Sequence, residues 1–371
     1  MTKNKKILFL GKRLDAIQVA VESGYDVYVM NYQRGHKKIK PTKSKKYFEV
    51  IYNGNFDSLK HIDFDVVIPM TEKAVELAYA FYKTRKLTRP DLEKYHLCHN
   101  KLAMKEHAKK MDIPVTEFQA VETPEHLINC LQTWGSPIVV KEIESSGGRG
   151  QRIIESADDI PEKLETKMIA EKWIKGKEFS VESFVYQGQV IFNNITEYHT
   201  HYHCNILPSY YSTEQKSQIV NFNQKVIQKF NIQNGIAHAE FFQTPTGLVL
   251  GEVAVRPPGG YLMKLIEMAY GFSPWRALID IESGIKPFVY DTPKTNAAVW
   301  IIHPGEMTVE KEPDFISVLN HPAIVDLKCG LKKGMKIPLR EGSGQDFGRI
   351  LMKSQDYQEL ISLIDKIKNI A

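Results

Sequence analysis

Two glutamates of this chain are spaced so that a hairpin would set them against each other. Residues 235–260 read GIAHAEFFQTPTGLVLGEVAVRPPGG, in which TPTG is typical of a turn between two apolar, β-prone runs. If Thr244 pairs with Leu248 across this turn, then Glu240 pairs with Glu252. Their Cβ atoms would lie about 5 Å apart, and two unit charges at that separation repel by roughly 3 kcal/mol at an effective dielectric near 20. The pairing therefore predicts a divalent cation between the two carboxylates.

The ligand type narrows the choice of cation, and the same face of the hairpin carries further polar groups. Carboxylate oxygens favour Mg²⁺ (or Mn²⁺) over zinc.

His238 and Arg256 would share this face, and His238 could order phosphate or substrate groups. It could equally be a buried histidine with satisfied hydrogen bonds. A register slip of one residue would turn one carboxylate to solvent and remove the site.

A second segment combines a lysine with a glycine-rich loop. Residues 137–150 read PIVVKEIESSGGRG, so Lys141 stands at the end of an apolar strand and Ser145–Gly150 forms the loop. Loops of this kind present free backbone N–H groups to phosphate oxygens, and a lysine adds a point charge. The loop is not a P-loop, because no Gly-Lys-Ser/Thr follows at the required spacing. The pattern predicts phosphate binding, with a mobile surface hairpin as the alternative.

A third segment could hold a purine and a ribose. In residues 170–184, AEKWIKGKEFSVESF, Trp173 and Ile174 could pack on a flat ring and offer backbone groups to its edge. Glu178 could accept hydrogen bonds from ribose hydroxyls. The alternative is an ordinary amphipathic strand, in which Glu178 simply points outward.

Strand and helix signals alternate along the part of the chain that precedes these segments. The first 94 residues predict a small α/β unit with a parallel sheet. Its expected elements are strands at Ile7–Leu10, Tyr25–Met30 and Val66–Pro69 and helices at Leu14–Glu22 and from Thr71. Gly11 stands alone after the first strand, so the fingerprint of a dinucleotide-binding turn is missing.

Bulk composition predicts a cytoplasmic globular protein of two or three domains. The 371 residues are 43% hydrophobic and 25% charged, with a net charge of +5. No apolar run approaches the ~18 residues that span a membrane, and four widely spaced cysteines suit a reducing compartment. The basic stretch KKIKPTKSKK, residues 37–46, is more typical of a solvated loop than of a nucleic-acid patch. We expect neither a membrane nor a nucleic-acid partner.

The three segments, in this order and at these spacings, resemble the ATP-grasp superfamily of ligases. The resemblance covers about residues 95–285, and GEVAVRPPGG is most similar to the carboxylate–amine and amino-acid ligases. It implies an α/β and α+β chain in three parts. A Rossmann-like pre-ATP-grasp domain would span residues 1–94, and the ATP-grasp domain residues 95–285 with a lid at about 113–175. A small C-terminal α+β domain would span residues 286–371.

The resemblance also implies roles for individual residues. The implied ATP-binding set is Lys101, Lys141, Ser145, Ser146, Gly147, Gly148, Glu171, Trp173, Ile174 and Glu178. Among these, the lysines would bind phosphate, the loop would close over it, and Glu171 would belong to the strand at the adenine edge. Glu240 and Glu252 would bind the metal, Arg256 would steady the transferred phosphate, and the Gly259–Gly260 turn would hold the substrate carboxylate.

One position departs from the family pattern. The family commonly has Asn two residues after the second acid, as a further metal ligand, and this chain has Ala254 there. We therefore expect one firmly held Mg²⁺ and one weak ion.

The activity that the resemblance implies is ATP-dependent ligation of a small carboxylate, such as an amino acid, to an amine. The reaction would pass through an acyl phosphate, release ADP and phosphate, and require no protein nucleophile. One alternative is an ATP-grasp carboxylase acting on a small acid or purine precursor. Another is a catalytically silent ATP-binding module that regulates or scaffolds. The resemblance also suggests a homodimer.

Three alternating histidines remain outside these roles. His199, His201 and His203 would share one face of a strand at metal-ligand spacing. Tyrosines surround them, so the lining of a substrate pocket or a solvated surface is the favoured interpretation, and a dedicated metal site is the alternative.

Overall fold

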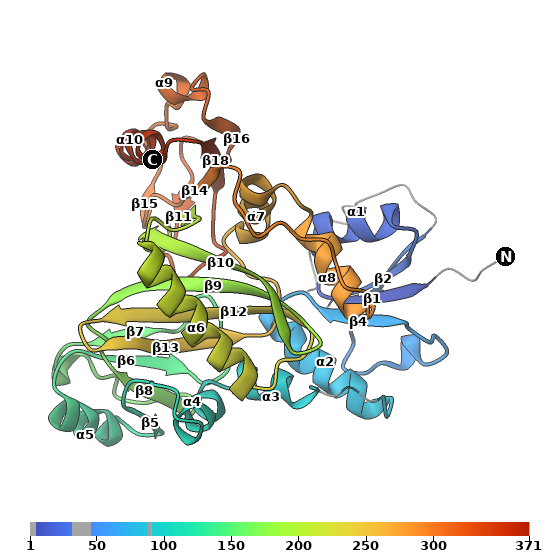
Figure 1. The fold of residues 1–371 in the computed structure, drawn as a ribbon. Coiled ribbons are helices and arrows are strands. Elements are labelled where there is room, and N and C mark those ends of the chain that lie inside the picture. Colours follow the sequence, from blue (N-terminus) through green and yellow to red (C-terminus); the bar gives the residue numbers. More distant parts are fainter. Residues whose placement is uncertain (1–4, 32–45, 88, 90, 371) are drawn as a thin grey trace.

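The computed structural model describes residues 5–31, 46–87, 89 and 91–370. Most of the basic stretch at residues 37–46 lies outside the described residues. The N-terminal part is a parallel sheet in the order β3-β2-β1-β4 (Figure 1). Its strands are β1 (Lys6–Leu10), β2 (Asp26–Asn31), β3 (Tyr47–Ile51) and β4 (Val66–Pro69), with helices α1 (Leu14–Glu22) and α2 (Glu72–Thr84). The predicted α/β unit with a parallel sheet is confirmed, and β3 is an additional edge strand.

Two short helices lead into a small antiparallel sheet, which we call the lid sheet because it falls in the range predicted for the lid. The helices are α3 (Glu93–His99) and α4 (Lys101–Lys110). The lid sheet has the order β5-β8-β6-β7 and is covered by α5. Its elements are β5 (Phe118–Val121), α5 (Pro124–Trp134), β6 (Ile138–Glu142), β7 (Arg152–Ile154) and β8 (Met168–Lys172). The glycine-rich loop therefore joins two adjacent strands, β6 and β7, of this sheet.

An eight-stranded sheet in the order β13-β12-β9-β10-β11-β14-β18-β16 forms the centre of the molecule. Its first strands are β9 (Lys177–Tyr186), β10 (Gln189–Thr200), β11 (Cys204–Leu207), β12 (Gly235–Thr244) and β13 (Gly247–Ala254). The C-terminal strands β14 (Asn296–Ile302), β16 (Ile324–Cys329) and β18 (Gly348–Ser354) extend the same sheet through the β11–β14 pair. The sheet is thus continuous across residue 286, where the sequence changes character.

Helices cover both faces of the central sheet. Helix α6 (Thr213–Lys229) packs on β10, whereas α8 (Pro274–Glu282) packs on β9 and β12 and α7 (Leu262–Tyr270) on β11 and β14. Ile236 lies in the core shared with α7 and α8, and its neighbour Ala237 lies in the core shared with α6, as strand alternation requires. Helix α8 also contacts α1, which joins the N-terminal domain to the central sheet (Figure 1).

The remaining C-terminal elements complete a third core. They are β15 (Met307–Thr308), α9 (Ile316–Leu319), β17 (Lys336–Ile337) and α10 (Tyr357–Lys368). Among the described residues, no helix has the length and apolar character needed to cross a membrane.

Candidate active site

The two predicted metal acids face each other across β12 and β13. Glu240 pairs directly with Glu252, and His238 pairs with Ala254. The Glu240 side chain is 32% exposed to solvent and the Glu252 side chain 22%, so both carboxylates can reach a ligand. The predicted pairing of the acids is therefore confirmed.

The turn that produces this pairing differs from the prediction. Thr244 pairs with Gly247 and not with Leu248, so the pairing at the turn is shifted by one residue from the predicted one. A bulge then inserts Gly251 as an unpaired residue, and the extra residue restores the register that the acids require. A Cβ on Gly251 would lie 2.9 Å from the ring of Phe242, so only glycine fits the bulge.

A buried histidine connects Glu240 to a second carboxylate beneath it. His238 Nδ1 lies 3.0 Å from Glu182 Oε1, and His238 Nε2 lies 3.4 Å from Glu240 Oε1. Burial lowers the pKa of His238, but the two carboxylates outweigh it and raise the pKa to about 9. Burial likewise raises the pKa of Glu240, but the hydrogen bond from His238 and its charge bring it down to about 2. Glu240 is therefore ionised at neutral pH, as a metal ligand must be. Glu182 accepts its other hydrogen bonds from Ser180, Asn194 and Thr196.

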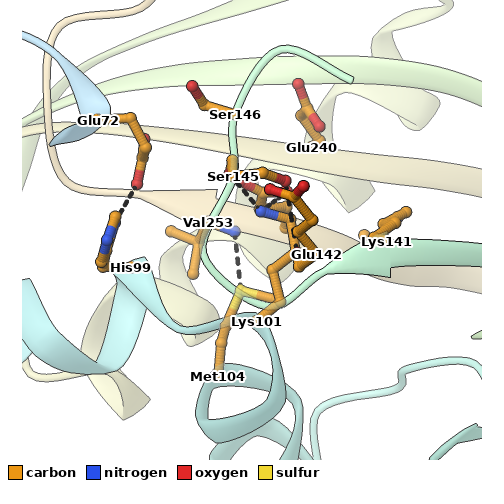
Figure 2. Close-up of polar contacts among 12 residues, drawn as sticks. Glu72, His99, Lys101, Met104, Lys141, Glu142, Ser145, Ser146, Glu240 and Val253 are labelled. Carbon is orange, nitrogen blue, oxygen red and sulfur yellow. Dashed lines mark hydrogen bonds and ion pairs between the residues drawn. The ribbon is translucent and has the colours of Figure 1, made fainter. Parts of the chain in front are cut away.

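The two predicted phosphate lysines approach the acids from different elements. Lys101 begins α4, where its Nζ donates to the Ser145 carbonyl at 2.5 Å and lies 3.6 Å from Glu252 Oε2 (Figure 2). Lys141 ends the apolar run of β6. Burial lowers the pKa of Lys141, but Glu171, whose Oε2 lies 3.3 Å from its Nζ, and the charges of Glu252 and Glu240 raise it by a larger amount.

Glu171 is buried in β8 between two ammonium groups. Its Oε2 lies 3.3 Å from Lys141 Nζ and 3.4 Å from Lys105 Nζ. Its Oε1 is buried and makes no hydrogen bond. The carboxylate thus anchors the lysines with one oxygen and leaves the other for a donor on a ligand.

The glycine-rich loop lies against the C-terminal domain. Ser343 N donates to the Gly147 carbonyl at 2.6 Å. Both Gly147 and Gly148 have positive φ, at +65° and +74°. A Cβ on Gly148 would lie 2.1 Å from the Tyr202 hydroxyl, so the close approach of the loop depends on glycine. In this arrangement the loop covers Lys101, whose ammonium binds its first carbonyl.

The predicted adenine and ribose residues follow β8 and enter β9. Trp173 and Ile174 lie between these strands, and the Trp173 side chain is 39% exposed. Glu178 lies in β9, with its Oε2 3.6 Å from His201 Nδ1. Burial and the nearby Glu240 raise the pKa of Glu178 to about 8. Trp173 is therefore open to stack on a ring, and Glu178 is positioned at the edge of the acid pair.

Arg256 is held by a carboxylate from the N-terminal domain. Arg256 Nε donates to Glu72 Oε2 at 2.6 Å. The other oxygen, Glu72 Oε1, lies 2.9 Å from His99 Nδ1, as Figure 2 shows. Burial lowers the pKa of Arg256, but Glu72, Glu252 and Glu240 raise it, which places the guanidinium within electrostatic reach of the acid pair. Burial raises the pKa of Glu72, but Arg256 and His99 outweigh it and lower the pKa to about 2.

The depressed pKa of Glu72 predicts an acid-sensitive contribution to stability. A carboxylate with a lowered folded-state pKa stabilises the fold above its unfolded pKa of about 4.5 and loses that contribution as the pH falls toward 2. Between pH 7 and pH 3 we expect Glu72 to cost the wild-type protein about 2 kcal/mol of its free energy of unfolding. The Glu72→Gln variant should not show this additional loss. Urea denaturation at both pH values measures it, with the exposed Glu310→Gln as the matched control. An equal acid loss in wild type and Glu72→Gln would contradict the assignment.

The predicted carboxylate-binding turn leads directly into α7. Gly260 and Tyr261 both have positive φ, at +56° and +61°, and Leu262 N donates to the Gly259 carbonyl. A Cβ on Gly259 would meet nothing within 4 Å, so the turn is open on this side. The turn combines with the positive end of the helix to form a surface that suits a carboxylate.

The three alternating histidines do not share a strand face. Strand β10 ends at Thr200, so His199 lies in the strand whereas His201 and His203 lie in the following turn. His203 makes its contacts with the Ile301 carbonyl and with Arg340. Within the described ranges, no group of three or more His, Cys, Asp or Glu side chains is arranged to hold a metal. The strand-face arrangement is therefore wrong for these histidines.

The acid pair nevertheless fits a Mg²⁺ ion that arrives with a nucleotide. Mg²⁺ is commonly held by one or two carboxylates together with substrate phosphates, and a complete protein cage is not needed. Glu240 and Glu252 supply two such carboxylates from adjacent strands. Lys101 and Lys141 would bind the phosphates that arrive with the metal.

The structure adds residues to the site that sequence reasoning did not identify. They are Glu72, His99, Lys105 and Glu182. Only Lys105 carried a sequence signal, because it follows Lys101 by four residues and so shares its helix face. The others come from elements distant in sequence, and their contacts depend on the tertiary arrangement.

Comparison with known proteins agrees with this geometry. Residues 106–263 match the family model of the ATP-grasp domain. These residues form an ATP-grasp domain. The predicted superfamily, with its mixed α/β fold, is confirmed.

Proteins similar to this chain include amino-acid ligases. The L-arginine-specific L-amino acid ligase of Bacillus subtilis is 26% identical over 329 residues, which span 82% of this chain and 80% of the relative. The L-amino acid ligase of Bacillus licheniformis superposes with a TM-score of 0.80 at 17% identity and covers 100% of this chain and 98% of its own. Carboxyaminoimidazole ribonucleotide synthase of Aspergillus clavatus, complexed with ATP, has a TM-score of 0.80 at 19% identity, with 99% of each chain covered. The prediction of an enzyme of the ATP-grasp ligase type is confirmed.

Proposed function

We propose that this ATP-grasp ligase joins a small carboxylate to an amine through an acyl phosphate, with release of ADP and phosphate. The observation that carries the proposal is the direct pairing of Glu240 with Glu252, with Lys101 Nζ 3.6 Å from Glu252 Oε2. Lys141 and Arg256 are held by Glu171 and Glu72. Two cations from separate elements and two opposed acids suit a site where negative charge gathers on phosphoryl and carboxylate oxygens.

ATP would bind between the lid and the central sheet. Lys101 and Lys141 would bind phosphate oxygens, and the backbone N–H groups from Ser145 to Gly148 would close over them. Trp173 and Ile174 would pack against the adenine, whose amino group could donate to the free Glu171 oxygen. Glu178 would accept from the ribose hydroxyls.

The metal would sit between Glu240 and Glu252. When bound, Mg²⁺ (or Mn²⁺) supplies positive charge that neutralises the phosphate oxygens during transfer. Ala254 offers no third ligand at the position opposite His238, so one firmly held ion and one weak ion remain our expectation.

The protein groups would offset the repulsion between anions and would keep water away from the reacting groups. A substrate carboxylate attacking the γ-phosphate brings two anions together, and Lys141 and Arg256 offset that repulsion. The acyl phosphate then has a good leaving group, so an amine can displace phosphate to form the amide and no protein nucleophile is required. The glycine-rich loop, docked on Ser343, would keep water from the acyl phosphate.

The substrates would be an amino acid or a similar small carboxylate and a small amine. The open Gly259–Gly260 turn at the start of α7 would bind a substrate carboxylate. The residues from Tyr198 to Tyr211 would line the acceptor side, where Tyr202 touches the glycine-rich loop. The amino-acid ligases among the relatives support this substrate class.

A carboxylase-type reaction is the second candidate. It is favoured by one observation, the equally high TM-score with the carboxyaminoimidazole ribonucleotide synthase. In that reaction bicarbonate would take the place of the organic carboxylate. A silent ATP-binding module receives less support, because both acids, both lysines and Arg256 are in place.

A phosphate-release screen across pairs of amino acids tests the proposal. We expect ATP turnover only when a carboxylate and an amine are both present, with the amide detected by mass spectrometry in bicarbonate-free buffer. Hydroxylamine in place of the amine should yield the hydroxamate of the activated acid. Turnover that needs bicarbonate and no organic acid would favour the carboxylase, and nucleotide binding without turnover would favour the silent module.

Two further expectations belong to this proposal. A cytoplasmic location fits the four free cysteines, of which Cys98, Cys130 and Cys204 are buried. A homodimer is the expected assembly, which light scattering would test.

A further inference from the structure

Strand β13, which carries Glu252, is the edge strand of the central sheet. The outward backbone groups of an edge strand need partners other than a neighbouring strand. Leu250 N donates to the Pro114 carbonyl at 2.8 Å. Val253 N lies 3.2 Å from Met104 Sδ, a contact visible in Figure 2. Groups outside the sheet therefore close this edge next to the acid.

One face of helix α4 contacts three consecutive residues of β13. Lys101, Met104 and Lys105 follow the i, i+3, i+4 spacing that places side chains on one helix face. Lys105 Nζ donates to the Gly251 carbonyl at 3.1 Å, Lys101 lies against Glu252, and Met104 against Val253. The helix thus contacts β13 at the bulge and immediately after it.

The bulge decides on which face of the sheet Glu252 lies. From the turn to the bulge, the register pairs Gln243 with Leu248. If Gly251 paired regularly with Glu240 and formed no bulge, that register would continue and place Glu252 opposite Ala239. Ala239 is fully buried in the core shared with α6, so the carboxylate would point into an apolar core and away from Glu240.

Lys105 is the group that holds the bulge. Its side chain is 0% exposed, although burying an ammonium is costly unless its partners are well placed. The partners are the Gly251 carbonyl and Glu171 Oε2, and Glu171 also binds Lys141. Lys105 therefore links the bulge in β13 to the lid strand β8.

We propose that Lys105 is a positioning residue that fixes the Gly251 bulge, so that Glu252 faces Glu240 ready for a metal–nucleotide complex. Through Glu171 it also ties the acid pair to the strand at the predicted adenine edge. The consequence for metal binding rests on the proposed function, whereas the effect on the bulge does not.

The test compares Lys105→Met with Lys110→Met, which removes an exposed lysine from the same helix. In nucleotide-free protein, amide hydrogen exchange in residues 250–253 should become at least about tenfold faster in Lys105→Met and stay unchanged in Lys110→Met. Exchange in the interior strand β9 should not change in either variant. With ADP present, Mn²⁺ binding followed by electron paramagnetic resonance should weaken by roughly 10- to 100-fold in Lys105→Met alone.

A second variant keeps the proposal testable if Lys105→Met does not fold. Gly251→Ala places a Cβ 2.9 Å from the Phe242 ring and 3.1 Å from the Glu240 carbonyl, so it should displace the bulge and weaken Mn²⁺ binding at least about tenfold while the thermal transition remains cooperative. Wild-type exchange and wild-type Mn²⁺ affinity in Lys105→Met would overturn the proposal, as would wild-type Mn²⁺ affinity in Gly251→Ala. If no carboxylate and amine pair is ligated by the wild type but the exchange result holds, the proposed reaction fails and the role of Lys105 stands.

Discussion

Replacing Glu252 with alanine should lower ADP formation by at least about 10³-fold and leave the fold intact. The loss follows because Glu240 alone cannot hold a metal firmly against competing water. A 10³-fold loss of rate corresponds to about 4 kcal/mol of transition-state stabilisation. The fold should tolerate the change, since Glu252 retains 22% of its exposure and faces a second carboxylate. Removal of like-charge repulsion should leave the free energy of unfolding equal or raise it.

Steady-state ADP formation and thermal unfolding measure the two effects separately. Glu252→Gln keeps the shape of the side chain and removes its charge, so it should be nearly as inactive as Glu252→Ala. Glu310→Ala, which removes an exposed glutamate of the C-terminal domain, is the control for activity and stability. Activity of Glu252→Ala within a few-fold of wild type would count decisively against the metal role of the pair.

Replacing Arg256 with methionine should lower both turnover and stability, and a second substitution should restore only stability. Under the proposed function Arg256 steadies the transferred phosphate, so its loss should reduce kcat by about 10²- to 10³-fold, as for other groups that stabilise transferred charge. It would also leave Glu72, which is 6% exposed, without its closest cation. Breaking a buried ion pair from one side costs on the order of 3–5 kcal/mol.

The double variant Glu72→Gln/Arg256→Met separates these two roles. With the buried charge also removed, most of the lost unfolding free energy should return, because no uncompensated carboxylate remains. Turnover should stay low, because nothing replaces the guanidinium. Urea denaturation and kcat give the two readouts. Recovery of turnover in the double variant would show that Arg256 serves only to neutralise Glu72.

The ion pair of Arg256 with Glu72 also brings the N-terminal domain into the site. Glu72 begins α2 and His99 ends α3, so both precede the residues that match the ATP-grasp family model. His99 Nδ1 lies 2.9 Å from the other oxygen of Glu72, and burial lowers the pKa of His99 while Glu72 and two further glutamates raise it by a larger amount. The carboxylate is thus held between Arg256 and His99, and the position of Arg256 depends on how this domain docks.

The sequence predicted those parts of the site that local periodicity controls. The alternation of β12 and β13 placed Glu240, Glu252 and His238 on one face, and the apolar run before Lys141 predicted a strand followed by a loop. The turn pairing was wrong by one residue, and the acids still face each other because the Gly251 bulge compensates. A bulge of this kind depends on contacts from α4, which the sequence of the hairpin does not contain.

Other features depend on long-range packing and could not be inferred from a pattern. Glu72 lies 184 residues from Arg256 in the chain, and nothing in the spacing of either residue indicates their contact. The pairing of β11 with β14 carries the central sheet into the C-terminal region, although the sequence there changes character near residue 286. The histidines after Thr200 alternate as a strand would, yet a turn ends the regularity.

The most direct test of carboxylate activation follows oxygen from substrate to phosphate. With a ligated pair from the screen, the acid is supplied with ¹⁸O in its carboxylate, and the released phosphate is analysed by mass spectrometry or by the isotope shift of its phosphorus resonance. An acyl-phosphate route predicts one ¹⁸O atom in each phosphate, in equal amount to the ADP and the amide. Unlabelled phosphate released together with ADP and amide would contradict the account.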